Sequence, residues 1–158
     1  MTFPRSTGQL PVYYNRRPTS FRSHLDLTRE PLWSFGFGLS YTTFALADLQ
    51  VTSPVIAPGG RTDVSVRVTN TGKRDGDEVV QLYVRDQVSS VTRPVKELRG
   101  FERVTLKPAE SRRVTFTLGP DELSLIDRKM QRVVEPGRFD VMVGTSATPV
   151  LTATLDVR

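Results

Sequence analysis

The chain has 158 residues, of which 37% are hydrophobic and 25% are charged, a length and composition typical of one folded domain rather than a disordered chain. It contains no cysteine, which excludes disulfides, thiolate metal sites and cysteine nucleophiles. Its net charge of +5 comes from basic residues scattered among acids, and no apolar run approaches about 18 residues, so we expect neither a nucleic-acid partner nor a membrane partner.

Residues 1–43 are rich in aromatic residues, proline and glycine. Within them, residues 9–14 have the character of one strand. A single strand with no partner nearby in the sequence leaves its backbone hydrogen-bonding groups unsatisfied. We therefore expect this region to be a piece of a larger folded unit.

From Phe44 onward, short alternating runs are separated by turn residues, which is typical of an antiparallel sandwich or barrel. The two clearest runs place their apolar residues on one face, where we expect them to form core: Val64, Val66, Val68, Val80, Leu82 and Val84. Residues 73–76 lie between these runs and end in a glycine. This arrangement predicts a β-hairpin.

Further runs bring the number of predicted strands to about seven, at residues 44–51, 98–106, 114–118, 139–143 and 151–157. That number is typical of a fibronectin-type sandwich. No long stretch has helical periodicity, although Asp121 is placed to cap one helical turn over residues 121–126. The predicted fold class is all-β.

Several motifs, in order along the chain, resemble the C-terminal end of bacterial family 3 glycoside hydrolases of the β-glucosidase type. FPRSTGQLPVYYN at 3–15 and EPLWSFGFGLSYTTF at 30–44 resemble the end of that family's α/β sandwich domain. VTNTG at 68–72, VVQLY at 79–83, RPVKELRGF at 93–101 and EPGRF at 135–139 resemble its fibronectin type III-like domain. The resemblance implies an irregular α/β-domain tail at 1–43, followed by a fibronectin type III-like (immunoglobulin-like) sandwich at 44–158.

The resemblance also bears on catalysis. In most three-domain members, a barrel carries the nucleophilic Asp and the α/β domain carries the acid/base Glu upstream of the stretch seen here. Retaining hydrolysis needs two carboxyl groups about 5 to 5.5 Å apart. We therefore expect no catalytic residue and no cofactor in this chain, and β-glycoside hydrolysis only in the parent enzyme. Its expected partners are the upstream catalytic domains, with β-glucosides or oligosaccharides as candidate ligands; the compartment stays open.

The aromatic group Trp33, Phe35 and Phe37 is the one place where the residues suggest contact with a carbohydrate. Sugar C–H faces pack on exposed aromatic rings. Structural packing is the default interpretation, because such rings are usually buried. We treat the three residues as candidate substrate-proximal positions.

Three other features could suggest a metal site, a phosphate-binding site or a catalytic histidine, but their sequence context argues against each. The acids Asp75, Asp77 and Glu78 do not have the spacing of a calcium loop, so we predict no metal site. The motif at 36–38 begins like a phosphate-binding fingerprint but lacks its third glycine. His24 is the sole histidine, and an isolated histidine in an irregular segment is more often a surface residue than a catalytic base.

Three hypotheses follow for the chain as a whole. In the first, it is an accessory module that stabilises or docks onto catalytic domains. In the second, it is a freestanding carbohydrate- or surface-binding module. In the third, it is a truncated reading frame without a separate function. We also expect the apolar stretch 3–37 either to fold back on the sandwich or to promote self-association.

Overall fold

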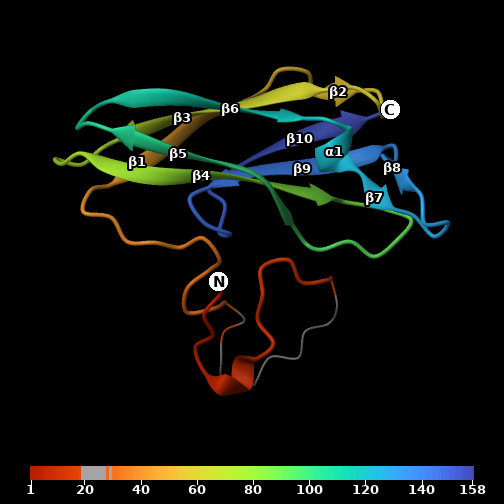
Figure 1. The fold of residues 1–158 in the computed structure, drawn as a ribbon, viewed down its shortest axis with the longest axis horizontal. Helices are drawn as coiled ribbons and strands as arrows, with labels where there is room; N and C mark the ends of the chain where they lie inside the picture. Colours follow the sequence, from red (N-terminus) through yellow and green to blue (C-terminus); the bar gives the residue numbers. More distant parts are fainter. Residues whose placement is uncertain (19–27, 29) are drawn as a thin grey trace.

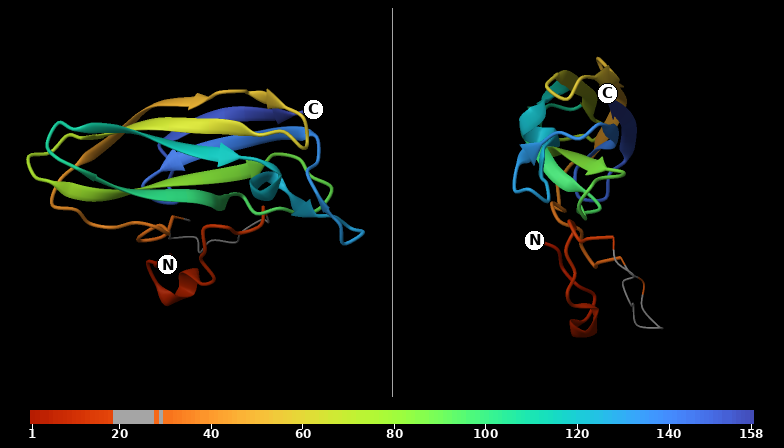
Figure 2. Two further views of the ribbon diagram at one scale, coloured as in Figure 1. Left: turned by 45° about the horizontal axis from the view of Figure 1, so that its top comes forward. Right: turned by 90° about the vertical axis from the view of Figure 1, so that its right-hand side faces the viewer.

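The computed structural model describes residues 1–18, 28 and 30–158, so His24 lies outside the described residues. Two facing sheets form the body of the molecule. The first 43 residues are here called the leading segment, and its described residues lie on one side of that body (Figures 1 and 2). Among the described residues, no helix is both long enough and apolar enough to cross a membrane.

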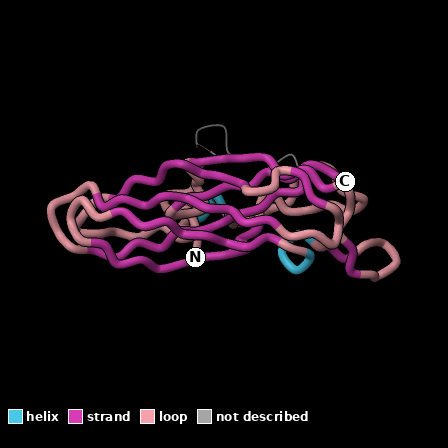
Figure 3. Tube along the Cα trace, turned by 90° about the horizontal axis from the view of Figure 1, so that it is seen from above, coloured by secondary structure: helices cyan, strands magenta, loops and turns pink. Residues whose placement is uncertain are grey.

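The three-stranded sheet contains, in spatial order, β1 (Phe44–Val51), β3 (Thr62–Asn70) and β6 (Ser111–Leu118). The five-stranded sheet contains β2 (Val55–Ile56), β10 (Leu151–Val157), β9 (Gly137–Gly144), β4 (Gly76–Asp86) and β5 (Glu97–Leu106). All neighbours pair antiparallel except β2 and β10, which are parallel. A small sheet of β7 (Leu125–Ile126) and β8 (Arg132–Val133) extends from one end (Figure 3). The predicted all-β sandwich of about seven main strands is confirmed.

The core lies between the two sheets, and all six apolar residues predicted for it are buried. In β3, the alternate residues Val64, Val66 and Val68 have no exposed surface. Val80 and Leu82 in β4 face them from the opposite sheet, as the two-residue period of a strand requires. Burial of these side chains, each favourable by roughly 1.5 to 3 kcal/mol, drives the packing of the two sheets.

The predicted hairpin between β3 and β4 is wrong, because the two strands belong to different sheets. The buried side chain of Asn70 organises the crossing. Its amide nitrogen donates to the carbonyl oxygens of Arg74 (2.8 Å) and Leu106 (3.0 Å). Its oxygen accepts from the Thr42 hydroxyl (2.8 Å) and the Gly72 N–H (3.0 Å). Two strands that face one core show the same alternation of valines in the sequence whether they pair in one sheet or lie in opposite sheets. The alternation alone therefore cannot predict the pairing.

A single helical turn, α1 (Pro120–Leu123), forms where one was expected, but Asp121 is not its cap. The helix begins at Pro120, a residue favoured at the first helical position, so the capping position falls on Gly119. The Glu122 carboxylate accepts a hydrogen bond from the Gly119 N–H (2.9 Å). Asp121 instead forms an ion pair with Arg132 (3.0 Å).

The strand predicted for residues 9–14 is also wrong, because this part of the leading segment is irregular after one 3-10 turn, η1 (Thr7–Gln9). The Gln9 side chain replaces a strand partner. It accepts from the Arg5 N–H (2.7 Å) and donates to the carbonyl oxygens of Thr28 (3.2 Å) and Glu30 (3.0 Å). Side-chain bonds to the main chain therefore hold this segment together where a sheet was expected to do so.

Candidate functional site at the junction of the leading segment and the sandwich

The leading segment covers part of the outer face of the five-stranded sheet. Gln81 and Tyr83 alternate with the core residues of β4 and so point away from the core, yet they are only 4% and 0% exposed. The Gln81 amide nitrogen donates to the carbonyl oxygens of Thr145 (2.8 Å) and Gly36 (3.4 Å). The Tyr83 hydroxyl donates to Gln81 Oε1 (2.5 Å). Burial raises the pKa of the Tyr83 hydroxyl far above its ordinary value.

Aromatic rings extend this contact into the leading segment. The ring of Tyr14 stacks on Phe35, with centroids 4.5 Å apart, and meets the ring of Tyr83 edge-on at 5.8 Å. Ring pairs in these geometries add about 0.5 to 1.5 kcal/mol to the free energy gained by burying their area. The outer surface of β4 is therefore a small packed interface, in which Tyr14 and Phe35 of the leading segment lie against the sandwich.

Hydrogen bonds fix the position of the segment on the sheet. The Ala147 N–H donates to the Phe35 carbonyl oxygen (2.7 Å). The Val95 N–H donates to the Arg16 carbonyl oxygen (2.8 Å). These bonds tie two separate stretches of the segment, at Arg16 and at Phe35, to two loops of the sandwich, so the segment is anchored at more than one point.

Gly36 is the residue that this close approach requires. Its φ of +79° lies in the left-handed region, which residues other than glycine rarely adopt. A Cβ atom at Gly36 would lie 2.3 Å from Gln81 Oε1, whereas one at Gly38 would meet nothing within 4 Å. Within the motif at 36–38, the first glycine is therefore the one that allows the leading segment to pack closely against β4.

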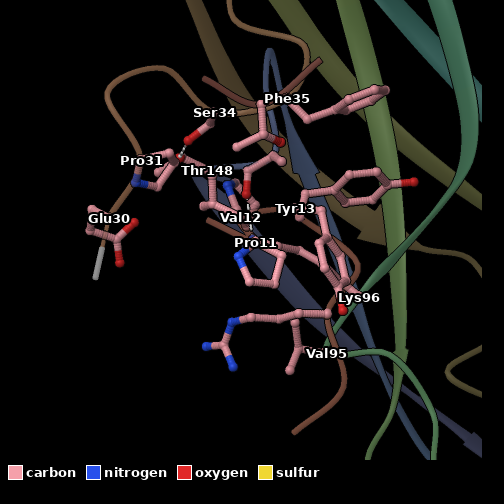
Figure 4. Close-up of a pocket in the computed structure, with 15 residues that line it drawn as sticks. Pro11, Val12, Tyr13, Glu30, Pro31, Ser34, Phe35, Val95, Lys96 and Thr148 are labelled. Carbon is pink, nitrogen blue, oxygen red and sulfur yellow. Dashed lines mark hydrogen bonds between the residues drawn. The ribbon is translucent and has the colours of Figure 1, made fainter. Parts of the chain in front are cut away.

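A pocket of about 260 Å³ lies in the junction, between the leading segment and the loops of the sandwich (Figure 4). Its lining includes the rings of Tyr13 and Phe35 together with Lys96. The Lys96 ammonium group donates to the Ala147 carbonyl oxygen. Burial lowers the pKa of Lys96, and the nearby carboxylate of Glu30 opposes this shift. The aromatic side chains of Tyr13 and Phe35 and the half-buried ammonium group of Lys96 give this pocket a mixed apolar and polar character.

The three candidate substrate-proximal residues do not form one cluster. Trp33 and Phe37 have nearly parallel rings, 8° apart in plane angle with centroids at 6.4 Å, and are 46% and 50% exposed. The ring of Phe3 packs edge-on against Trp33 at 5.5 Å, beside the isolated bridge between these two residues. Phe35 lies apart from them, in the interface with Tyr14. Contact between any of these rings and a sugar stays a prediction.

Exposed apolar side chains are concentrated in the leading segment. Among the described residues, nine of the fifteen exposed large hydrophobic side chains belong to it: Met1, Phe3, Leu10, Tyr13, Leu32, Trp33, Phe37, Leu39 and Tyr41. Composition alone pointed to this aromatic region, but its division into a buried inner side and an exposed outer side depends on tertiary contacts.

Of the three acids considered as a metal site, Asp77 and Glu78 are held by separate interactions. The Asp77 carboxylate accepts from the Thr105 hydroxyl and pairs with Arg103, and both contacts lower its pKa. The Glu78 carboxylate accepts from the Val79 N–H (2.9 Å). Within the part of the chain that the structure describes, no group of three potential metal ligands comes together.

Residues 78–147 match the family described as "Fibronectin type III-like domain". A β-xylosidase from Formosa agariphila is 51% identical over 151 residues, which cover 93% of this chain and 21% of the relative. A periplasmic β-glucosidase from Salmonella typhimurium is 42% identical over 161 residues, covering 95% of this chain and 21% of the relative.

The solved structures of two β-glucosidases share the fold over nearly the whole chain. The enzyme from Erythrobacter marinus matches with a TM-score of 0.94 and 41% identity, covering 99% of this chain and 21% of that chain. The enzyme from Listeria innocua in complex with glucose matches with a TM-score of 0.91 and 36% identity, covering 99% and 23%. This chain thus spans about a fifth of the length of the relatives that it matches. It contains a fibronectin type III-like domain and corresponds to the C-terminal accessory portion of family 3 glycoside hydrolases.

Proposed function

We propose that the leading segment docks onto the catalytic domains of a family 3 glycosidase and that the sandwich holds the segment in the orientation required. The observation that carries this proposal is the two-sided character of the segment. One side is bonded to β4 and the loops of the sandwich, whereas the other presents the rings of Phe3, Trp33 and Phe37 to solvent.

A contiguous exposed apolar surface of this kind marks an interaction site, because leaving it in water is unfavourable. The rest of the parent protein is the natural partner, since the similar stretches occur within proteins about five times as long. In this proposal the parent hydrolyses β-glycosidic bonds, as the names of the relatives indicate for those proteins. This chain packs against the catalytic domains and fixes their orientation, and it does not hydrolyse glycosides by itself.

The proposed division places residues 1–43 with the α/β domain and residues 44–158 in the fibronectin type III-like domain. The contacts of Thr42 favour a sandwich that begins slightly earlier. Thr42 is only 9% exposed, and its hydroxyl donates to Asn70 at the crossing between the sheets. A shortened chain that retains Thr42 should therefore fold better than one that begins at Phe44.

A second candidate function is saccharide binding, favoured by the parallel and half-exposed rings of Trp33 and Phe37. Trp33 is the only tryptophan, so its fluorescence reports on this surface directly. The docking proposal predicts no saturable change when cello-oligosaccharide is added to the isolated chain. A saturable change that disappears in Phe37→Ala would favour the saccharide-binding function instead.

The docking proposal is tested with a chimera in which this chain replaces the matching stretch of the Salmonella β-glucosidase. We expect the chimera to be soluble and to hydrolyse a nitrophenyl β-glucoside. The Salmonella protein without that stretch is expected to lose solubility or activity, and this chain alone is expected to be inactive. A chimera no better than the shortened Salmonella protein would contradict the proposal, as would turnover by this chain alone.

A further inference from the structure

Residues 37–41, here called the connecting run, join the part of the leading segment that lies on β4 to the first strand of the sandwich (Figure 1). Both flanks of the run are anchored. On one side, the Gly36 carbonyl oxygen accepts from the Gln81 amide nitrogen (3.4 Å). On the other side, the Thr43 carbonyl oxygen accepts from the Thr71 N–H (2.8 Å). The run is therefore held at both ends.

The connecting run is also nearly extended. Gly36 lies against the side chain of Gln81. Ser40 Oγ lies 3.6 Å from the position that a Cβ atom on Gly76 would take. Gly76 and Gln81 are separated by roughly 17 Å along β4, at the usual rise of a strand. The four steps from Gly36 to Ser40 reach about 14 Å at most, so only a nearly extended path brings both residues close to their contacts on β4.

The main chain of the run has no partner inside the molecule. Among the residues that the structure describes, the main-chain N–H and carbonyl groups of residues 38–41 form no hydrogen bond. A strand within a sheet satisfies the same groups by pairing with its neighbours. The exposed residues 38–41 instead leave these donors and acceptors to solvent, as the outer strand of a sheet does along its open edge.

Large apolar side chains accompany this unpaired main chain. Successive side chains of an extended chain point to opposite sides, so Leu39 points away from β4 when its neighbour Ser40 faces it. Leu39 is 93% exposed, and Tyr41, at the bend into the sandwich, is 92% exposed. Phe37 shares the side of Leu39 and stacks with Trp33. The run therefore extends the exposed apolar surface of the leading segment.

An extended main chain without partners, next to alternate apolar side chains, has the properties that β-strand addition requires. In this mode of recognition, main-chain hydrogen bonds to an edge strand provide affinity, and alternate side chains pack on the partner. Anchoring at both ends lowers the entropic cost of binding, because the run is already extended before it meets its partner. A partner that offered only an apolar pocket would cover the side chains and leave the main-chain groups unpaired.

We propose that residues 37–41 add as a strand to a sheet edge of the catalytic domains, with Phe37 and Leu39 packed on one face of that sheet. The inference rests on the proposed function, because the sheet belongs to the same domains. Two observations favour this partner over a second copy of the chain. Similar stretches occur within proteins about five times as long, and the run is continuous with the exposed ring of Trp33.

Residue-resolved hydrogen exchange in the isolated chain and in the active chimera tests the pairing. Amide protons of residues 38–41 should exchange without protection in the isolated chain. In the chimera, alternate amides of the run should exchange about a hundredfold more slowly, because every second N–H of a strand points toward its partner. Protection of alternate amides distinguishes strand pairing from general burial of the run.

Leu39→Ser provides a second measurement. Because Leu39 is exposed in the isolated chain, the substitution should leave the melting temperature of that chain unchanged. It should make heat inactivation of the chimera about tenfold faster, because the side chain loses its packing on the partner sheet. The matched control is Val55→Ser, at an exposed position on β2, which should affect the two proteins equally. Equal inactivation of the Leu39→Ser and unsubstituted chimeras would contradict the packing of Leu39.

The remaining outcomes separate this inference from the proposed function. An active chimera in which Leu39 and Tyr41 are protected from hydroxyl radicals, while the amides of residues 38–41 exchange as in the isolated chain, would overturn strand addition and leave the proposed function in place. Amide protection in the isolated chain that grows with protein concentration would overturn the inference as well, because the partner would then be a second copy. A chimera that is inactive without any substitution would overturn the proposed function and this inference with it.

Discussion

At the scale of single residues, Asn70 illustrates how one buried side chain can decide a connection. All of its hydrogen-bonding groups find partners around the crossing between the two sheets, and it has no exposed surface. The sequence motif VTNTG drew attention to this position through family resemblance. The alternation of apolar residues could not identify its role, because that role depends on the carbonyl oxygen of Leu106, 36 residues away.

We predict that Asn70→Ala lowers the free energy of unfolding by about 2 to 4 kcal/mol, because buried donors and acceptors lose their partner. Urea denaturation of the isolated chain measures this loss. Lys73→Ala, at an exposed position in the same connection, serves as the control and should change stability by less than about 0.5 kcal/mol. Equal effects of the two substitutions would show that the Asn70 bonds do not organise the crossing.

Asp86 gives a prediction about pH. Burial raises the pKa of Asp86, so its folded-state pKa lies above its unfolded value and its ionised form destabilises the isolated chain at neutral pH. Asp86→Asn should therefore stabilise the chain at pH 7, and the gain should shrink as the pH falls through the raised pKa of Asp86 toward the ordinary pKa of an aspartate, 3.8. Urea titrations across this range measure the gain. A gain that does not vary with pH, or the same profile in Asp75→Asn, would contradict this account.

At the scale of elements, the strands were predictable where one face is buried and the other is solvated. The alternation in β3 gave its core residues correctly. In β4, residues 80–84 are buried on both faces. The outer face is buried because the leading segment covers it, and the local sequence pattern does not record that cover. The pairing of strands and the irregular path of residues 9–14 depend on distant contacts that no local pattern records.

Gly36 provides the sharpest test of the contact between these elements. We predict that Gly36→Ala loosens the leading segment, because the new methyl group requires an unfavourable φ and collides with Gln81. Limited proteolysis should cut the segment faster while the sandwich stays folded. Gly38→Ala is the matched control, since a Cβ atom there meets nothing within 4 Å. Identical cleavage rates for the two variants would contradict the role assigned to Gly36.

At the scale of the whole molecule, family resemblance and strand pattern together predicted the sandwich, and the comparisons confirm the resemblance. The candidate site was predictable only as an aromatic region. Its separation into Phe35 at the inner interface and Trp33 with Phe37 on the outer surface follows from how the segment lies on β4. The central claim is that this outer surface is covered in the parent enzyme.

Hydroxyl-radical footprinting with mass spectrometry tests that claim most directly, by comparing side-chain oxidation in the isolated chain and in the active chimera. Trp33 and Phe37 should be oxidised readily in the isolated chain and protected in the chimera. Val55, which is 49% exposed on β2 at the opposite edge of the five-stranded sheet from β5, is the internal reference and should react equally in both. Equal oxidation of Trp33 and Phe37 in the two proteins would contradict the claim that this face docks onto the catalytic domains.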